Sequence, residues 1–392
     1  MEHYLDQSST TRPSEKSIEA ANRVNHESWG NPSSVHAVGQ TAAAVLRDAR
    51  VTVGRTLGMP RFSKDSLIFT ASGTESNNLA MLGSAHSKKR DPEHPGTIII
   101  SAGEHPSIEN PALLLEKEGY TVVRVPTSGG VLDLDYLKDA LESAESPVVF
   151  AGFMLVNNET GAVYDVKSAA SMVKHKFPDA VVHCDAVQGY MKRKFTPYTL
   201  GVDTLTVSAH KIHSVRGSGA LFVSAEVLKR RNLSPVMPGG GQENGFRSGT
   251  ENLSAIAGFA AAADEGFANL DDNLARTAAL RARLEDRLAK LDVKFNRPQG
   301  ESLPNITSVV LPSIRSETML NYLSGKEIYV SAGSACAANS KKKSAALAAF
   351  GVDEKTADSV IRVSLDYTNT EEDIDAFADA LGEGVASLQR KR

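Results

Sequence analysis

The chain has 392 residues, of which 41% are hydrophobic, and a formal net charge of -4 at pH 7. This length exceeds what one hydrophobic core usually serves, so we expect two domains. The charge excludes a broad basic surface for nucleic acid, and the absence of 18 consecutive apolar residues excludes a membrane span. The polar N-terminus and only two cysteines, Cys184 and Cys336, predict a cytoplasmic protein without a structural disulfide.

Strand-like and helix-like segments alternate through the first two thirds of the chain, a pattern typical of a mostly parallel sheet covered by helices. The strand-like segments are short runs rich in β-branched residues. Together they predict an α/β domain with a seven-stranded sheet, whose strands are expected at residues 66–70, 97–101, 121–125, 147–156, 180–184, 203–207 and 219–223.

From about residue 250 the composition changes to an Ala-, Leu- and Arg-rich helical stretch that runs towards residue 291 with a break. Short strands at 305–311 and 360–365 and a last helix at 371–388 follow. We therefore predict a large domain over 16–260 and a smaller α+β domain over 261–392, with residues 1–15 packing on the small domain.

Polar side chains follow five of the predicted strands. Ligands of parallel sheets bind at the carboxyl ends of the strands, so we expect these residues to lie together. The turn with Gly73 and Thr74 opens a helix and suits a phosphate, although, taken alone, a simple N-cap by Ser72 or Thr74 is the better explanation of this turn. The other strand ends contribute His105, the Asn157–Gly161 turn with Asn158, Asp185 with Gln188, and finally Ser208, His210 and Lys211.

These groups match one ligand, pyridoxal 5'-phosphate (PLP). A phosphate fits Gly73, an aromatic ring fits His105, a ring nitrogen fits Asp185 and an aldehyde fits Lys211. A metal site built on His210 and His213, or on His183 to Asp185, lacks further ligands at a zinc-type spacing. The "GSG" of residues 217–219 precedes a strand rather than a helix, which is unlike a dinucleotide-binding loop.

Several segments resemble the signatures of the cysteine desulfurases, within the class V aminotransferase branch of fold-type I PLP enzymes. The resemblance runs from Tyr4 to about Leu365, and its segments are "YLDQSSTT", "GNPSSVH", "FTASGTESNNLA", "GEHPSI", "VNNETG", "HCDAVQ", "SAHKIH", "PGGGQENGFRSGTENL", "SAGSAC" and "IRVSL".

The resemblance implies a PLP site and a homodimer. It implies that Lys211 carries the Schiff base, that His105 stacks on the ring and assists proton transfer, and that Asp185 pairs with the ring nitrogen. Phosphate contacts are implied for Gly73, Thr74, Ser208 and His210, ring contacts for Asn158 and Gln188, and a contact to the neighbouring subunit's phosphate for Thr250.

The resemblance also assigns the substrate side of the site. L-cysteine is expected to bind through Arg362 and Asn31, and Cys336 to take its sulfur as a persulfide, leaving alanine. The sulfur then passes to an acceptor or scaffold protein for iron–sulfur clusters or for thiolation of tRNA or cofactors. No resident metal is expected, although Cys336 is expected to contact a cluster on an acceptor transiently.

Some residues depart from the family pattern. Asn244 and Asp366 stand where arginine and glycine are common, and Lys341 to Lys343 replace an acidic loop exit. Two other functions therefore stay open: a selenocysteine lyase or related PLP lyase, and a sulfur-trafficking scaffold that has lost catalysis.

Overall fold

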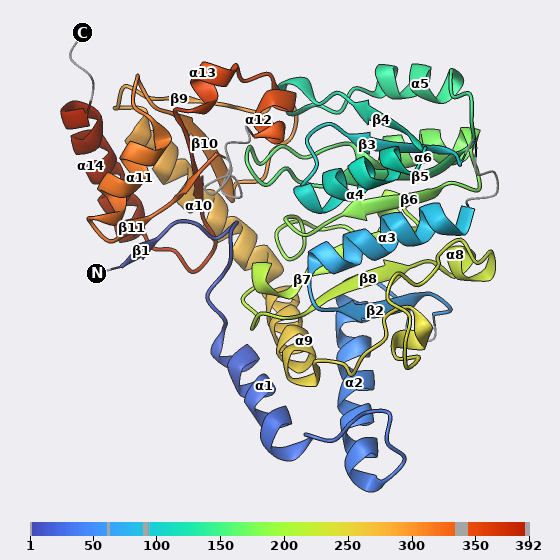
Figure 1. The fold of residues 1–392 in the computed structure, drawn as a ribbon. Coiled ribbons are helices and arrows are strands. Elements are labelled where there is room, and N and C mark those ends of the chain that lie inside the picture. The colour runs from blue at the N-terminus through green and yellow to red at the C-terminus, as the bar shows by residue number, and fades with distance from the viewer. Residues whose placement is uncertain (1, 61–62, 89–92, 94, 334–343, 389–392) are drawn as a thin grey trace.

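The computed structural model describes residues 2–60, 63–88, 93, 95–333 and 344–388. Its main sheet has seven strands in the order β2-β8-β7-β6-β5-β3-β4, and only β8 runs antiparallel to its neighbours (Figure 1). The predicted α/β fold class is thus confirmed. The strands are β2 (Ser66–Thr70), β3 (Thr97–Ser101), β4 (Thr121–Val125), β5 (Val148–Met154), β6 (Val181–Asp185), β7 (Thr204–Ser208) and β8 (Gly219–Val223).

Helices cover both faces of this sheet, because its strands are buried on both sides. In β3, Ile98 and Ile100 point into one core and Ile99 into the other. The helices on the Ile98 face are α3 (Gly73–Lys88), α4 (Pro106–Lys117) and α8 (Ala225–Lys229). The opposite face packs against α2 (Ala37–Thr56), α5 (Leu134–Glu142), α6 (Val166–Lys176) and α9 (Leu253–Ala268), while α7 (Pro197–Leu200) precedes β7.

The C-terminal part forms a second core around an antiparallel sheet with the order β12-β13-β10-β9. Its strands are β9 (Lys294–Phe295), β10 (Ile306–Val310), β12 (Ser331–Ala332) and β13 (Val360–Ser364). The helices here are α10 (Leu270–Leu288), α11 (Ser316–Ser324), α12 (Ala345–Phe350), α13 (Glu354–Ala357) and α14 (Glu371–Leu388).

Asn269 forms the predicted break in the long helical stretch, since it ends α9 and begins α10. The expected domain boundary at 260/261 falls inside α9, whose Ala262 and Ala263 still pack in the first core. The exact domain limits therefore stay a prediction.

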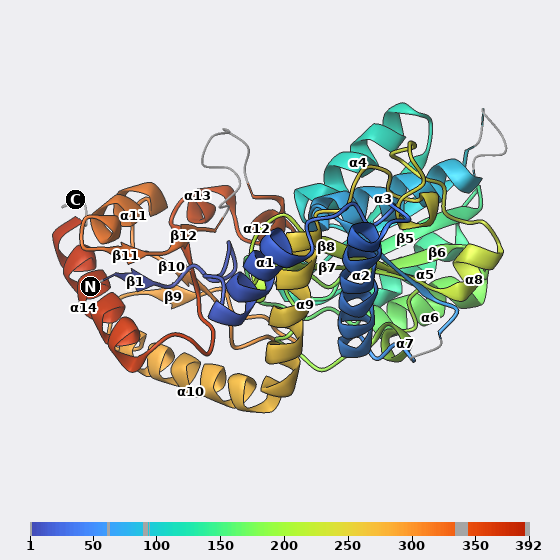
Figure 2. The ribbon, with the colours of Figure 1, turned by 90° about the horizontal axis from the view of Figure 1, so that it is seen from below.

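The N-terminal segment joins the two parts (Figure 2). Strand β1 (His3–Tyr4) pairs in parallel with β11 (Ile328–Tyr329), and Leu5 packs in the second core. The chain then crosses to the first part and enters α1 (Glu15–Glu27), which packs on α9. None of the described helices is long and apolar enough to cross a membrane.

Candidate active site at the carboxyl ends of the strands

Strands β2, β3, β5, β6 and β7 run in the same direction, so their carboxyl ends meet at one edge of the sheet. This edge faces the crossing N-terminal segment. The residues expected from the sequence follow these ends. Their contacts define the geometry of a candidate site.

The N-terminus of α3 forms a tight cradle at Gly73. A Cβ atom at this position would lie 3.0 Å from Val187 Cγ2 and 3.3 Å from Ser208 Cβ, so only glycine fits without a shift. The hydroxyls of Thr206 and Ser208 close by are buried and make no hydrogen bond to any of the described residues. Free N–H groups and unsatisfied hydroxyls together fit a phosphate.

The N-cap interpretation of the same turn also applies, because Ser72 Oγ accepts the N–H of Glu75 at 3.2 Å. Thr74 itself is exposed, and its carbonyl accepts the side chain of Asn78. Neither of these two hydrogen bonds involves the hydroxyl of Thr74, so its contact to a phosphate stays a prediction.

Asp185 ends β6 and is held by two N–H donors. Asn77 Nδ2 donates to its Oδ2 at 2.7 Å, and the backbone N–H of Val187 donates to its Oδ1 at 3.0 Å. The carboxylate is almost completely buried. An oriented, buried carboxylate fits a protonated ring nitrogen.

His105 is the N-cap of α4, and its Nδ1 accepts the backbone N–H of Ser107 at 3.1 Å. Burial lowers the pKa of His105, and the charge of Lys211 acts in the same direction, whereas Asp185 opposes them. The imidazole is therefore neutral near pH 7, as stacking on a cationic ring requires.

Lys211 ends a 3-10 turn after β7, Ala209–Lys211. Its Nζ donates to the carbonyls of Ser8 and Ser9, both at 2.6 Å. Gln188 Nε2 donates to the same Ser8 carbonyl at 3.0 Å. The crossing N-terminal segment thus brings Lys211 and Gln188 together.

The same segment holds His210, whose Nδ1 lies 3.2 Å from Thr10 Oγ1. Its backbone carbonyl accepts the N–H of Thr11 at 2.9 Å. Burial, reinforced by the charge of Lys211, lowers the pKa of His210 to about 4. His210 is therefore a neutral neighbour of the lysine.

Arg362 reaches this edge from β13 of the second core and is almost completely buried. Its Nη2 donates to Asp6 Oδ1 at 2.8 Å and to Ser9 Oγ at 2.6 Å. Its Nη1 donates to the backbone carbonyl of Asn158 at 2.9 Å, whereas its buried Nε has no hydrogen-bond partner in the part of the chain that the structure describes. An unsatisfied buried guanidinium nitrogen fits a further anion, such as a substrate carboxylate.

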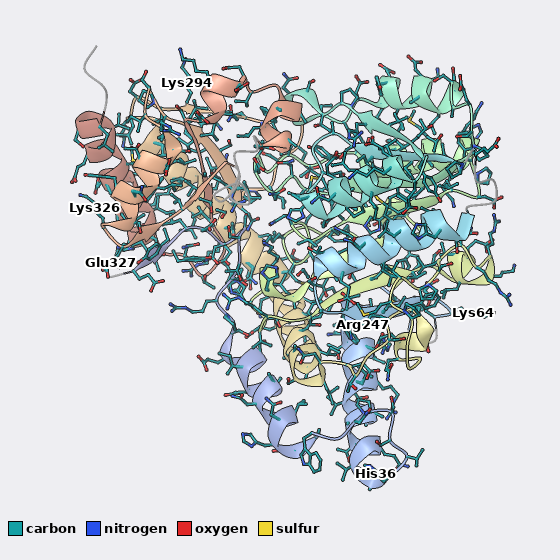
Figure 3. The ribbon with its side chains drawn as sticks, viewed as in Figure 1. His36, Lys64, Arg247, Lys294, Lys326 and Glu327 are labelled. Carbon is teal, nitrogen blue, oxygen red and sulfur yellow. The ribbon has the colours of Figure 1, made fainter. Side chains whose placement is uncertain are left out.

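Two predicted residues, Asn31 and Thr250, are not seen among these contacts, and a third lies outside the described residues. Asn31 lies in the loop between α1 and α2, away from the strand ends, and its Oδ1 accepts the N–H of Ser33; His36 at the end of this loop is labelled in Figure 3. Thr250 is exposed. Cys336 and Lys341 to Lys343 lie outside the described residues, whereas Cys184 is buried and burial raises the pKa of its thiol.

Comparison with known proteins agrees with this geometry. Residues 3–377 match the family described as aminotransferase class V. A curated cysteine desulfurase of Trichormus azollae is 36% identical over 391 residues, which cover 98% of this chain and 93% of the relative. The chain belongs to the class V aminotransferase family. Several curated relatives within this family are named cysteine desulfurases.

A further curated relative and two solved structures are also similar over nearly the whole chain. A NifS/IcsS protein homolog of Lactobacillus delbrueckii subsp. bulgaricus is 35% identical, over 97% of this chain and 96% of its own. A solved NifS-like protein superposes with a TM-score of 0.90 at 33% identity, covering 99% and 100% of the two chains. The solved structure of SspA in complex with cysteine gives a TM-score of 0.79 at 26% identity, covering 94% and 100%. Class V aminotransferases depend on PLP in general.

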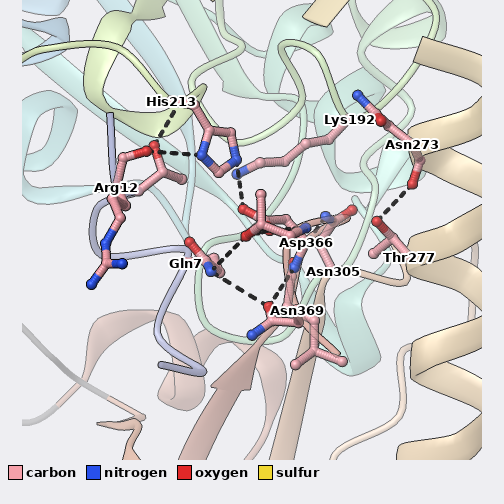
Figure 4. A network of polar contacts seen from close by, with 12 residues as sticks. Gln7, Arg12, Lys192, His213, Asn273, Thr277, Asn305, Asp366 and Asn369 are labelled. Atoms are coloured by element: carbon pink, nitrogen blue, oxygen red, sulfur yellow. Dashed lines mark hydrogen bonds and ion pairs between the residues drawn. The ribbon is translucent and has the colours of Figure 1, made fainter. Parts of the chain in front are cut away.

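One departure from the family pattern has a structural counterpart. Asp366, where glycine is common in the cysteine desulfurases, lies 2.7 Å from Nε2 of His213, and both side chains are nearly buried (Figure 4). His213 belongs to the loop after Lys211, and Asp366 follows β13. The pair therefore joins the two parts of the molecule beside the site.

Sequence reasoning missed Asp6, Ser8, Ser9, Asn77 and Lys192. The first four lie in segments quoted for their family resemblance, which was the only signal for them. Lys192 is buried, and its Nζ lies 3.4 Å from Gln188 Oε1. Burial lowers the pKa of Lys192 to about 8.

Among the described residues, no three His, Cys, Asp or Glu side chains gather as metal ligands, and both ring nitrogens of His183 are engaged with Thr204 and Asn77. A cavity of about 670 Å³ lies away from the strand ends, next to Arg55, Tyr190 and Phe267. It contains none of the residues predicted for the cofactor.

Proposed function

We propose that this protein, as a cysteine desulfurase, uses PLP bound through Lys211 to remove sulfur from L-cysteine, giving L-alanine and a persulfide on Cys336. The observation that carries the proposal is the meeting of Lys211, Asp185 and His105 at one sheet edge beside the unsatisfied Thr206 and Ser208 hydroxyls.

Each described residue has a role in this reaction. PLP, when bound, supplies the electron sink that makes the substrate Cα–H acidic. Lys211 acts as the base at the substrate α-carbon, and Asp185 holds the ring nitrogen. Arg362 binds the substrate carboxylate through its Nε, which has no hydrogen-bond partner among the described residues.

Sulfur transfer requires a thiolate outside the buried core. The thiolate of Cys336 forms an S–S bond with the substrate sulfur, and the Cβ–S bond breaks. The electron pair stays on the substrate carbon, which gains a proton and becomes the methyl group of alanine. Cys184 is unsuited to this role because it is buried and burial raises its pKa.

Partners follow from the same proposal. The substrate is L-cysteine, in keeping with the cysteine complex of the related SspA. The exposed Thr250 is available to complete the site of a second subunit in a cytoplasmic homodimer, and an acceptor or scaffold protein receives the sulfur. Sedimentation of the active protein as a monomer would contradict the homodimer.

Reduction of the PLP-loaded protein with borohydride tests the role of Lys211. We expect the pyridoxyl group on the peptide that contains Lys211, and we expect Lys211→Ala to lose the covalent chromophore. Lys290→Ala is the control, since Lys290 is exposed and pairs only with Asp286. A pyridoxyl group on another lysine would disprove the assignment.

Replacement of the two cysteines separates cofactor binding from sulfur transfer. Cys336→Ala should bind PLP and change its spectrum on addition of L-cysteine, yet form almost no alanine, because no thiol can take the sulfur. Cys184→Ala should keep alanine formation. Parent-rate turnover by Cys336→Ala would replace this mechanism by direct elimination.

A further inference from the structure

Asn77 connects two side chains of the proposed cofactor site. It lies near the start of α3 and is almost completely buried. Its Nδ2 donates one hydrogen to Asp185 Oδ2 at 2.7 Å and the other to Ser107 Oγ at 2.8 Å. Both hydrogens of the amide are therefore used.

His183 fixes the orientation of this amide. His183 Nε2 lies 3.1 Å from Asn77 Oδ1, and its Nδ1 lies 2.9 Å from Thr204 Oγ1. An amide oxygen can only accept, so His183 Nε2 carries the hydrogen. Burial lowers the pKa of His183 to about 3, so the ring is neutral and Nδ1 accepts from the threonine hydroxyl.

The chain of hydrogen bonds ends at His105. His105 Nδ1 accepts the backbone N–H of Ser107 and therefore carries no hydrogen. Ser107 Oγ, which accepts from Asn77, lies 2.8 Å from the same Nδ1 and directs its own hydrogen there. Because the ring is neutral, its single N–H is at Nε2, which has no hydrogen-bond partner among the described residues.

We propose that Asn77, oriented by His183, is a positioning residue that holds the carboxylate of Asp185 and, through Ser107 Oγ, the ring of His105. The backbone N–H of Ser107 sets the Nε2–H tautomer of that ring. The inference rests on the proposed roles of Asp185 and His105 and names what orients them. His105 thus enters the reaction as a proton donor at Nε2, and accepts a proton there only after it has given one. Asn77 and His183 touch neither cofactor nor substrate.

Nitrogen-15 NMR of the full-length, histidine-labelled protein tests the tautomer, with and without PLP. The His105 signals are assigned by their loss in His105→Gln. We expect an unprotonated Nδ1 and a protonated Nε2 near pH 7. In Asn77→Leu, Ser107 Oγ loses its donor and is no longer directed at Nδ1, so the Nδ1 signal should shift from its parent position while Nδ1 stays unprotonated. PLP affinity should fall by roughly ten- to a hundredfold, the value of one hydrogen bond to a charged group.

The matched control is Asn78→Leu. Asn78 is the next residue of α3, and its side chain donates to the carbonyl of Thr74 in its own helix. This variant should keep the parent signals and PLP affinity. Equal shifts in both variants would mean that the helix, rather than the Asn77 amide, is responsible.

A second pair of variants covers the case in which Asn77→Leu does not fold. His183→Gln keeps an N–H donor for Asn77 Oδ1 and should retain the parent His105 signals, whereas His183→Leu should reproduce the Nδ1 shift of Asn77→Leu. A protonated Nδ1 in the parent, or parent signals in His183→Leu, would overturn the proposal. Correct tautomers in a protein that forms no alanine would instead contradict the proposed function alone.

Discussion

Burial sets the protonation of several side chains around Lys211. It lowers the pKa of Lys192 to about 8 and that of His210 to about 4, so His210 adds no positive charge beside the lysine at neutral pH. On the acidic side, burial raises the pKa of Glu104 to about 8. Glu104 precedes His105, and its Oε1 accepts the N–H of Met154 at 2.6 Å, whereas its buried Oε2 has no partner.

Glu104 makes stability depend on pH. The pKa of Glu104 is about 8 in the folded protein, above the ordinary value of 4.5. Its contribution to the free energy of unfolding is therefore complete below pH 4.5 and is lost as the pH rises to 8. The loss should amount to a few kcal/mol. The glutamine of Glu104→Gln cannot titrate. The free energy of unfolding of this variant, measured by urea titration, should therefore rise relative to that of the parent between pH 5 and pH 8. Glu142 is exposed, so the free energy of unfolding of Glu142→Gln should not rise relative to that of the parent. If unfolding free energy depended on pH in the same way for Glu104→Gln and for the parent, the argument would be refuted.

At the level of elements, the sequence predicts the bounds of the strands better than it predicts which strands pair with one another. Runs such as Ser66–Thr70 and Gly219–Val223 are local, continuous and mostly apolar, so their bounds agree with the structure. The antiparallel direction of β8 and the pairing of β1 with β11 depend on distant segments, and no local pattern encodes them. For the same reason the strand-end residues could be predicted, but their buried partners, Asn77 and Asp6, could not.

Strand β2, at one edge of the main sheet, has a partner that is distant in the sequence. Edge strand β2 offers the N–H of Phe69, which donates to Glu243 Oε2 at 2.8 Å. Both oxygens of Glu243 also bind Arg50 at 2.7 Å. One buried carboxylate thus satisfies the edge and fixes the loop that leads to Thr250.

Glu243→Ala should therefore lower the free energy of unfolding by about 3–5 kcal/mol, since it leaves a partly buried guanidinium and an edge N–H unpaired. The control is Asp264→Ala, which breaks the exposed Arg55 pair and should cost about 1 kcal/mol or less. Urea unfolding of both variants at one pH provides the comparison. Equal losses would show that the buried carboxylate has no special role.

For the whole molecule, the site depends on the junction of its two parts. Arg362 comes from the second core, Lys211 from the first, and residues 6–11 bind both. The His213–Asp366 pair adds a direct link (Figure 4). Burial is the largest influence on the pKa of Asp366 and raises it, but the contact and charge of His213 and the two hydrogen bonds from Thr368 together outweigh burial, so the pKa is lowered overall.

Asp366→Asn should weaken this junction by about 1–3 kcal/mol at neutral pH. A lowered folded pKa means that the contribution of Asp366 is present above its ordinary value of 3.8 and is lost as pH falls through the folded pKa. The difference from the parent should therefore shrink in strong acid. Asp379→Asn, which removes an exposed partner of Arg287, should change stability little. A loss for Asp366→Asn that is independent of pH would contradict the ion pair.

The central claim is that this molecule transfers sulfur from cysteine rather than eliminating it. The most direct measurement is to incubate the PLP-loaded protein with L-cysteine and a reductant, and to quantify alanine, pyruvate and sulfide together. The account predicts equal amounts of alanine and sulfide without pyruvate, because the substrate carbon keeps the electron pair of the broken C–S bond. Sulfide accompanied by pyruvate and ammonia, or no alanine at all, would contradict it.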